Sequence, residues 1–145
     1  MRNLVLIVTA FFVAIAAFAG GALILLREGG GGIDRSTPQA ATDQFLEAAL
    51  SLKDVNRLSL FVCSQWSAAR AMEAADLPTD PRLTPFWGDM DVTSAGESAT
   101  VTVRVIYRLY DDGEIQQQVQ MWSLRLEQQD GWRVCGLTKD PLLDP

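Results

Sequence analysis

Two cysteines, Cys63 and Cys135, are the most reactive side chains in this 145-residue sequence, which contains no histidine. The absence of histidine removes the usual general base at neutral pH and the commonest metal ligand. Cysteine–histidine and serine–histidine catalytic pairs are therefore excluded. Two cysteines without histidine do not make a structural zinc site. The sequence accordingly predicts neither a metal nor a cofactor.

The two cysteines are instead expected to form a disulfide bond. They enclose a loop with 71 residues between its ends. In the chain-entropy model such a closure contributes roughly 4 kcal/mol, against a net stability of ~5–15 kcal/mol for a domain. Two buried free thiols are the alternative. A redox-active role is disfavoured because no CxxC motif or flanking basic cluster is present to lower a thiol pKa.

The residues from Leu4 to Leu26 form an uncharged, apolar run of 23 residues. At ~1.5 Å per residue a helix of this length spans ~34 Å, enough to cross a hydrocarbon core of ~30 Å. Arg2 precedes the run, so we expect residues 1–3 to be a cytoplasmic stub and the remainder to lie outside the cytoplasm, where disulfides persist. A signal peptide cleaved after Ala17–Ala19 is the alternative. The apolar run continues past that site, which favours an uncleaved signal-anchor in the cell membrane.

A linker of residues 27–38 follows, and its four consecutive glycines make it flexible. From Gln39 onward the chain carries nine Lys or Arg and sixteen Asp or Glu, a net charge of −7. This charge disfavours nucleic acid and anionic lipid headgroups as ligands of the domain. The expected partners are therefore the lipid bilayer, through Leu4 to Leu26, and another protein of the cell envelope.

Three helices are expected at the start of the domain, which spans residues 39–138. The first runs from Pro38, capped by Thr37, to about Leu52. Its apolar residues recur at helical spacing and are Phe45, Leu46, Ala49, Leu50 and Leu52. The second begins after Asp54 and ends near Cys63, and the third is capped by Ser64. The inward residues of these two are expected to be Val55, Leu58, Phe61, Val62, Trp66, Ala69, Met72 and Ala75.

A sheet of about four strands follows. Residues 79–88 are expected to be irregular, with Thr84 to Gly88 closing the open end of the core. From Asp89 the period changes to two, and the clearest strand alternates from Thr100 to Leu109. Two tight turns are expected, at Asp111–Gly113 and Asp130–Gly131. The strands are predicted at 90–94, 100–109, 114–128 and 132–137, before a polar tail of residues 139–145.

The third of these strands changes phase along its length. Ile115, Val119 and Met121 share one face, whereas the other face carries Trp122, Leu124 and Leu126. A flat strand cannot bury both sets on one side. We expect a β-bulge near Met121–Trp122. The alternative is that the far end of the strand is covered on its opposite face.

Three stretches carry a resemblance to a known family: Ala40 to Ala48, Cys63 after the second helix, and Gly131 to Leu137. With three helices followed by a curved antiparallel sheet, the chain resembles the nuclear transport factor 2-like (NTF2-like) superfamily. It is also similar to small actinobacterial single-pass membrane proteins of unassigned function. The resemblance covers Gln39 to Leu137 and implies a cone-like α+β fold. Superfamily members usually have more strands before the third helix, so the size of the internal cavity is open.

The resemblance implies three kinds of function. Some members of the superfamily are isomerases or dehydratases that use a pocket carboxylate as a base. Here only Tyr107, with Asp89 or Asp91 at the mouth of the cone, is a candidate for such chemistry. A module for a small apolar ligand would line its pocket with aromatic residues, although core packing explains the same residues. This candidate lining is Trp66, Phe86, Trp87, Tyr107 and Trp122.

We expect the third kind, a non-enzymatic accessory or scaffold domain in a cell-envelope process. A flexible tether and an exposed sheet face suit docking to a larger assembly. The strand face that carries Gln116, Gln118 and Gln120 is a candidate for the docking surface, and plain solvation explains it equally.

Overall fold

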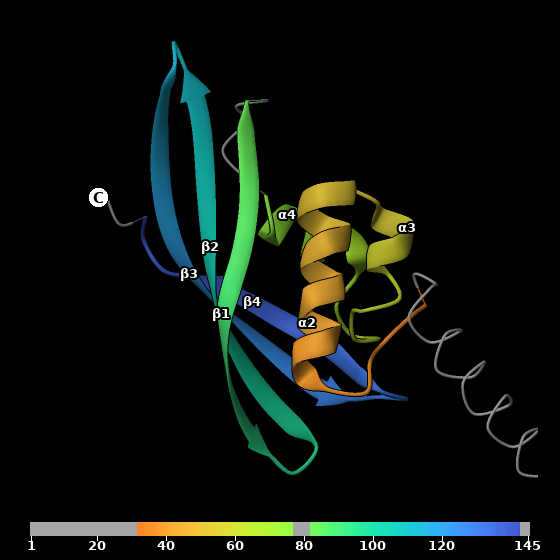
Figure 1. The fold of residues 1–145 in the computed structure, drawn as a ribbon. Coiled ribbons are helices and arrows are strands. Elements are labelled where there is room, and N and C mark those ends of the chain that lie inside the picture. Colours follow the sequence, from red (N-terminus) through yellow and green to blue (C-terminus); the bar gives the residue numbers. More distant parts are fainter. Residues whose placement is uncertain (1–31, 77–81, 143–145) are drawn as a thin grey trace, which may run out of the picture. The chain divides into compact units, whose positions relative to one another are not determined.

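The computed structural model describes residues 32–76 and 82–142, in which helices lie against one side of a curved antiparallel sheet (Figure 1). The predicted span of residues 4–26, the first five residues of the linker (27–31), residues 77–81 and the last three residues lie outside this part. Within the described ranges, no helix is long and apolar enough to cross a membrane. The α+β class with a four-stranded antiparallel sheet is confirmed.

The first helix has the predicted extent, but its second half has a different geometry. Helix α2 (Pro38–Leu46) begins at Thr37, whose Oγ1 accepts a hydrogen bond from the Ala40 N–H at 3.1 Å. A π-helical segment, η1 (Glu47–Leu52), continues it. Its wider turn shifts later residues out of the α-helical register. The prediction that Leu52 faces inward was therefore wrong, and this side chain is 50% exposed.

The next two helices are shorter than predicted. Helix α3 (Val55–Leu58) is capped by Asp54 as expected, but it is a single turn, so Val55 at its start is exposed. Helix α4 (Ala68–Ala74) is capped by Ser67, whose Oγ accepts a hydrogen bond from the Arg70 N–H. The predicted cap Ser64 was wrong, because the helix begins only at Ala68, and the Ser64 side chain bonds to Gln65 Oε1 instead. In α4 and its C-cap, Ala71 and Ala75 are buried, whereas the predicted Ala69 is exposed.

The sheet has the order β1-β2-β3-β4. Its strands are β1 (Leu83–Ala95), β2 (Ser98–Asp111), β3 (Glu114–Gln128) and β4 (Trp132–Lys139). Both predicted tight turns are present, with positive φ angles at Asp112, Gly113, Asp130 and Gly131. We call the side that faces the helices the inner face and the opposite side the outer face. The alternation predicted for β2 is confirmed, since Val101, Val103, Val105 and Tyr107 are buried on the inner face.

Strand β1 begins seven residues earlier than expected, so the prediction of irregular structure was wrong for residues 83–88. Pro85 is tolerated because β1 is an edge strand, where a residue without a backbone N–H does not interrupt pairing with a further strand. The pairing with β2 shifts register between Gly88 and Asp91. Asp89 adopts a left-handed conformation (φ 50°) in this bulge.

The predicted bulge in β3 was wrong. The register between β2 and β3 is unbroken from Ser98↔Glu127 to Asp111↔Glu114. The two apolar sets of β3 therefore lie on opposite faces: Trp122 and its neighbours are buried on the inner face, whereas Ile115 is 60% exposed on the outer face. A bulge does occur between β3 and β4, where Cys135 is the extra residue between Val134 and Gly136.

Candidate functional site

Tyr107 and Trp122 lie together in the core between the sheet and the helices. They are 1% and 0% exposed. The Tyr107 hydroxyl and the Trp122 Nε1–H both donate to Gln120 Oε1, at 3.1 and 2.9 Å. The amide of Gln120 in turn donates to the Asp140 carbonyl at 2.7 Å. Side chains with this little exposure border no space that admits water, and their polar atoms are satisfied within the chain.

The acid–base chemistry of this cluster is limited. Burial raises the pKa of Tyr107 to about 12, and the neighbouring Trp122 N–H opposes that shift only in part. The phenol is therefore protonated at neutral pH. Apart from Tyr107 and Trp122, Thr42 is the one buried residue with a polar side chain in the part of the chain that the structure describes. Asp89 is exposed and forms an ion pair with Arg104 at 2.8 Å, and Asp91 is exposed as well.

The other predicted pocket residues are dispersed. Trp66, in the segment between α3 and α4, stacks on Phe45 of α2 with ring centroids 6.1 Å apart. Trp87 lies on the inner face of β1, and its Nε1–H donates to Asp43 Oδ1 of α2 at 2.8 Å. Phe86 is the adjacent residue in β1, so it points to the outer face, and it is 42% exposed. Phe86 thus lies apart from the aromatic residues of the interior.

The predicted disulfide between Cys63 and Cys135 is present, with the two Cα atoms 5.0 Å apart. The chain before Cys63 runs beside β4, where the Cys63 N–H donates to the Val134 carbonyl and the Val134 N–H donates to the Phe61 carbonyl. The β4 bulge inserts Cys135 between two regularly paired residues. This extra residue re-aims its side chain, so the sulfur reaches the edge of the sheet where Cys63 lies.

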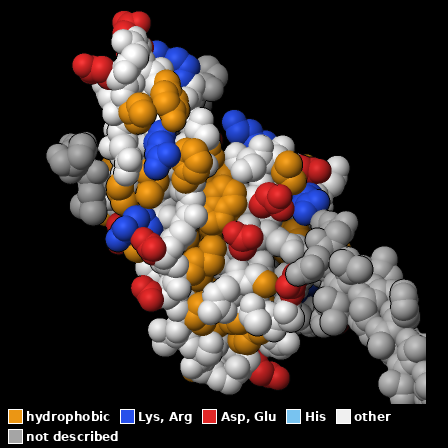
Figure 2. All heavy atoms as spheres, in the orientation of Figure 1, with side chains coloured by type: hydrophobic (Ala, Val, Ile, Leu, Met, Phe, Trp, Pro, Cys, Tyr) orange, Lys and Arg blue, Asp and Glu red, His pale blue; other side chains and the backbone are white. Residues whose placement is uncertain are grey.

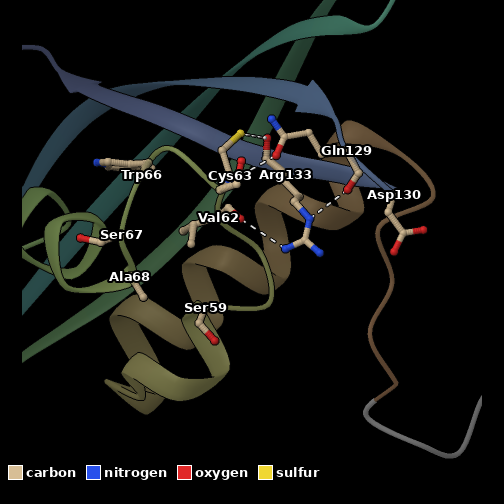
Figure 3. Close-up of a pocket in the computed structure, with 10 residues that line it drawn as sticks. Ser59, Val62, Cys63, Trp66, Ser67, Ala68, Gln129, Asp130 and Arg133 are labelled. Atoms are coloured by element: carbon tan, nitrogen blue, oxygen red, sulfur yellow. Dashed lines mark hydrogen bonds between the residues drawn. The ribbon is translucent and has the colours of Figure 1, made fainter.

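An open hollow of about 530 Å³ lies beside the disulfide, between residues 59–68 and 129–133 (Figure 3). On its wall the Arg133 guanidinium donates to the carbonyls of Gln129, Leu60 and Val62. Arg35 donates to the same Leu60 carbonyl. Burial and the nearby Arg35 charge both lower the pKa of Arg133. Arg133 therefore holds the loop before Cys63 against β4.

The outer face of the sheet carries an apolar surface that we did not predict from the sequence. Phe86 pairs with Ile106, which pairs with Val119 on β3, and Tyr110 pairs with Ile115 nearer the turn. Three of these side chains, Phe86, Tyr110 and Ile115, are 42%, 54% and 60% exposed. We call these five residues the outer-face stripe. The phase change of β3 was its signal in the sequence, which we attributed to a bulge.

Charged and polar residues lie within and beside the outer-face stripe. Arg108 and Gln117 form a cross-strand pair that separates Tyr110 and Ile115 from the other three residues. The Arg108 guanidinium lies 4.6 Å from the centroid of the Phe86 ring. At the turn beyond Tyr110 and Ile115 come Asp111, Asp112 and Glu114. Figure 2 shows hydrophobic side chains along the hairpin that β2 and β3 form, with acidic side chains at its tip. The glutamines predicted as a docking surface lie on the inner face instead, since Gln116, Gln118 and Gln120 pair with Leu109, Tyr107 and Val105.

Comparison of the sequence with protein-family models gave no match, and comparison with curated proteins gave none either. Solved structures do match. A candidate dehydratase of the NTF2-like family from Streptomyces avermitilis has a TM-score of 0.54 and 19% identity, covering 72% of this chain and 94% of the other.

An NTF2-like protein with a cystatin-like fold from Novosphingobium aromaticivorans also has a TM-score of 0.54, with 18% identity, covering 83% of this chain and 86% of the other. At these identities the likeness extends to the fold alone. The expected NTF2-like fold is confirmed.

Proposed function

We propose that this chain, which has the fold of NTF2-like proteins, is a membrane-anchored docking domain outside the cytoplasm, without catalysis, in a cell-envelope assembly. The main support for this proposal is the outer-face stripe, which exposes three large apolar side chains on strands β1, β2 and β3. Single exposed apolar residues are ordinary, but several large ones on one face of a sheet are typical of an interaction site.

The interior of the domain gives little support to catalysis or to ligand binding. Tyr107 and Trp122 are closed off from solvent and donate to the same glutamine oxygen. A ligand pocket needs a cavity of a few hundred Å³ with convergent polar groups. A general base needs a titratable group within reach of the substrate proton. Around these two residues, the described side chains supply neither feature.

The partner that fits the outer-face stripe is a protein with an apolar groove bordered by lysine or arginine. Tyr110 and Ile115 are cross-strand neighbours, so they would enter such a groove as one unit. Asp112 lies in the turn next to that pair and would meet the basic border, and Glu114 adds negative charge at the same turn. The same acidic residues disfavour insertion of the hairpin into an anionic membrane surface.

The anchoring part of the proposal comes from the sequence. The apolar run from Leu4 to Leu26 suits a membrane span, and the glycine-rich linker would let the domain turn toward its partner. The Cys63–Cys135 bond is consistent with folding in an oxidising compartment.

The experiment compares capture of partner proteins from native membranes by three forms of the full chain. These are the wild type, a Tyr110→Ser/Ile115→Ser double variant, and Val55→Ser as a control that alters an apolar residue of similar exposure (43%) on α3. We expect one protein to be enriched by the wild type and the control. The double variant should bind it at least about 30-fold more weakly, which corresponds to the ~2 kcal/mol of an interface hot spot.

Higher salt should weaken capture of the partner by the wild type, because the acidic turn contributes to the contact. Equal capture by the double variant would refute the role of the outer-face stripe. Binding of the domain to protein-free vesicles through Tyr110 and Ile115 would also refute it, since the stripe would then contact lipid rather than protein.

A further inference from the structure

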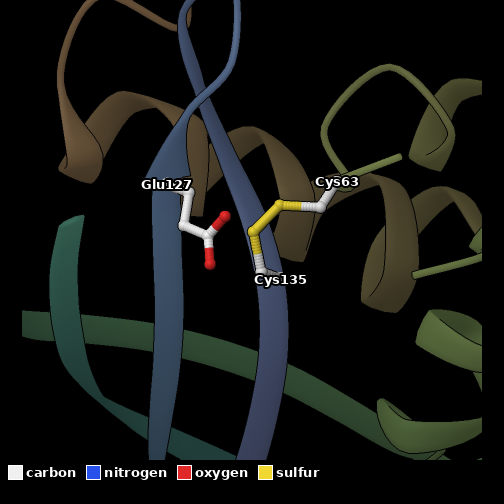
Figure 4. A group of neighbouring side chains, drawn as sticks. All are labelled: Cys63, Glu127 and Cys135. Carbon is white, nitrogen blue, oxygen red and sulfur yellow. A yellow bond between two sulfur atoms is a disulfide. The ribbon is translucent and has the colours of Figure 1, made fainter. Parts of the chain in front are cut away.

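Three potential metal ligands meet beside the disulfide. The sulfurs of Cys63 and Cys135 and a carboxylate oxygen of Glu127 all lie within 4.8 Å of one another. They come from the segment after α3, from the β4 bulge and from β3 (Figure 4). Both cysteines are buried and Glu127 is half-buried.

Glu127 has no cation as a partner within residues 32–76 and 82–142, although one is close in the sheet. Its cross-strand neighbour is Arg133, but that guanidinium turns to the carbonyls of the loop before Cys63. The Oε2 atom of Glu127 accepts weak hydrogen bonds from the amides of Gln65 and Gln129, at 3.3 and 3.4 Å. These amides hold the carboxylate beside the sulfurs, as outer groups hold metal ligands.

We propose that the reduced protein binds Zn²⁺ through Cys63 Sγ, Cys135 Sγ and the Glu127 carboxylate, with water as the fourth ligand. Three protein ligands plus water is the arrangement of an open zinc site. Two thiolates and a carboxylate supply three negative charges for a divalent cation, and thiolate ligands favour zinc over magnesium or calcium. The hollow lined by Cys63 and Gln129 is open to solvent and gives the ion a path of entry.

Formation of the site requires reduction of the disulfide. A dithiol reductant transfers two electrons and two protons to the Cys63–Cys135 bond and itself becomes a disulfide. Zn²⁺ then displaces the two thiol protons to solvent and bonds to the thiolates. At ~2.3 Å per Zn–S bond in a tetrahedral site the sulfurs would lie roughly 3.8 Å apart. In the disulfide the two sulfurs are bonded to each other instead, so the disulfide and the metal exclude each other.

The inference does not depend on the docking proposal, because it uses only the ligands, their neighbours and the hollow. The test uses the full chain in detergent micelles, reduced with a trialkylphosphine, because a dithiol would itself bind the metal. Cobalt(II) is added first, since cobalt bound by thiolates has a charge-transfer absorption, and Zn²⁺ is then used to displace it. Circular dichroism of each sample reports whether the reduced domain is folded.

We expect the reduced wild type to bind one equivalent of metal and the oxidised protein to bind none at the cysteines. Glu127→Gln should lower the affinity at least about tenfold, whereas Glu114→Gln at the other end of β3 should leave it unchanged. Unchanged affinity in Glu127→Gln, absence of a thiolate–cobalt band, or unfolding of the reduced domain with or without metal would each overturn the proposal.

Discussion

Removal of the Cys63–Cys135 bond should lower the stability of the domain by about 4 kcal/mol. The two cysteines are 72 positions apart, and closing a loop of that length restricts the unfolded chain by this amount in the chain-entropy model. A domain of this size has a net stability of only ~5–15 kcal/mol. The bond therefore accounts for a large share of the total.

The assay is urea unfolding followed by circular dichroism, with a metal chelator present. It compares the oxidised wild type, the reduced wild type and the Cys63→Ala/Cys135→Ala variant. For a slope of ~2 kcal/mol per molar urea, a loss of 4 kcal/mol lowers the midpoint by ~2 M. The reduced wild type and the double variant should coincide, because both lack the same cross-link. A loss below about 1 kcal/mol in both would refute the reasoning.

Three further predictions concern individual contacts. Folding raises the pKa of Tyr107 from 10.0 to about 12. The stability that this shift contributes is therefore complete below pH 10 and is lost as the pH rises toward 12. Unfolding measured against pH should show a decrease of roughly 2–3 kcal/mol over that interval, which Tyr107→Phe should lack. Ser67→Ala should destabilise the domain by ~1 kcal/mol through loss of the α4 cap. Ser64→Ala, measured by the same urea titration, should have almost no effect. Gln120→Leu should cost about 1–3 kcal/mol, because it leaves the Tyr107 hydroxyl and the Trp122 N–H buried without an acceptor. A stability equal to that of the wild type would show that another acceptor replaces Gln120.

The strongest periodic signals predicted the fold well. Strand β2 alternates from Ser98 to Tyr107, and the helix from Pro38 begins at its predicted cap. The errors occur where a local irregularity follows from tertiary packing. Pro85 and Gly88 indicate a loop in sequence but lie in an edge strand, and nothing in residues 47–52 marks the π-helical turn that exposes Leu52.

The candidate site was predictable only in part. The disulfide followed from cysteine usage, but the bulge that presents Cys135 depends on the register between β3 and β4. Tyr107 and Trp122 share an inner face because of strand alternation, whereas their common acceptor, Gln120, could not be inferred from the sequence. The apolar residues on the outer face of β3 were visible as a change of phase. Whether a bulge or an exposed surface explains that change is decided by strand pairing.

The most direct test of the docking function is photo-crosslinking in living cells that make the full chain. A photoreactive amino acid replaces Ile115 in the outer-face stripe and, as a control, Val55 on α3, which is also exposed. We predict a discrete crosslink to one protein at position 115 and none to that protein at position 55. Crosslinks only to lipid at position 115, or the same products at both positions, would contradict a docking role for the outer-face stripe.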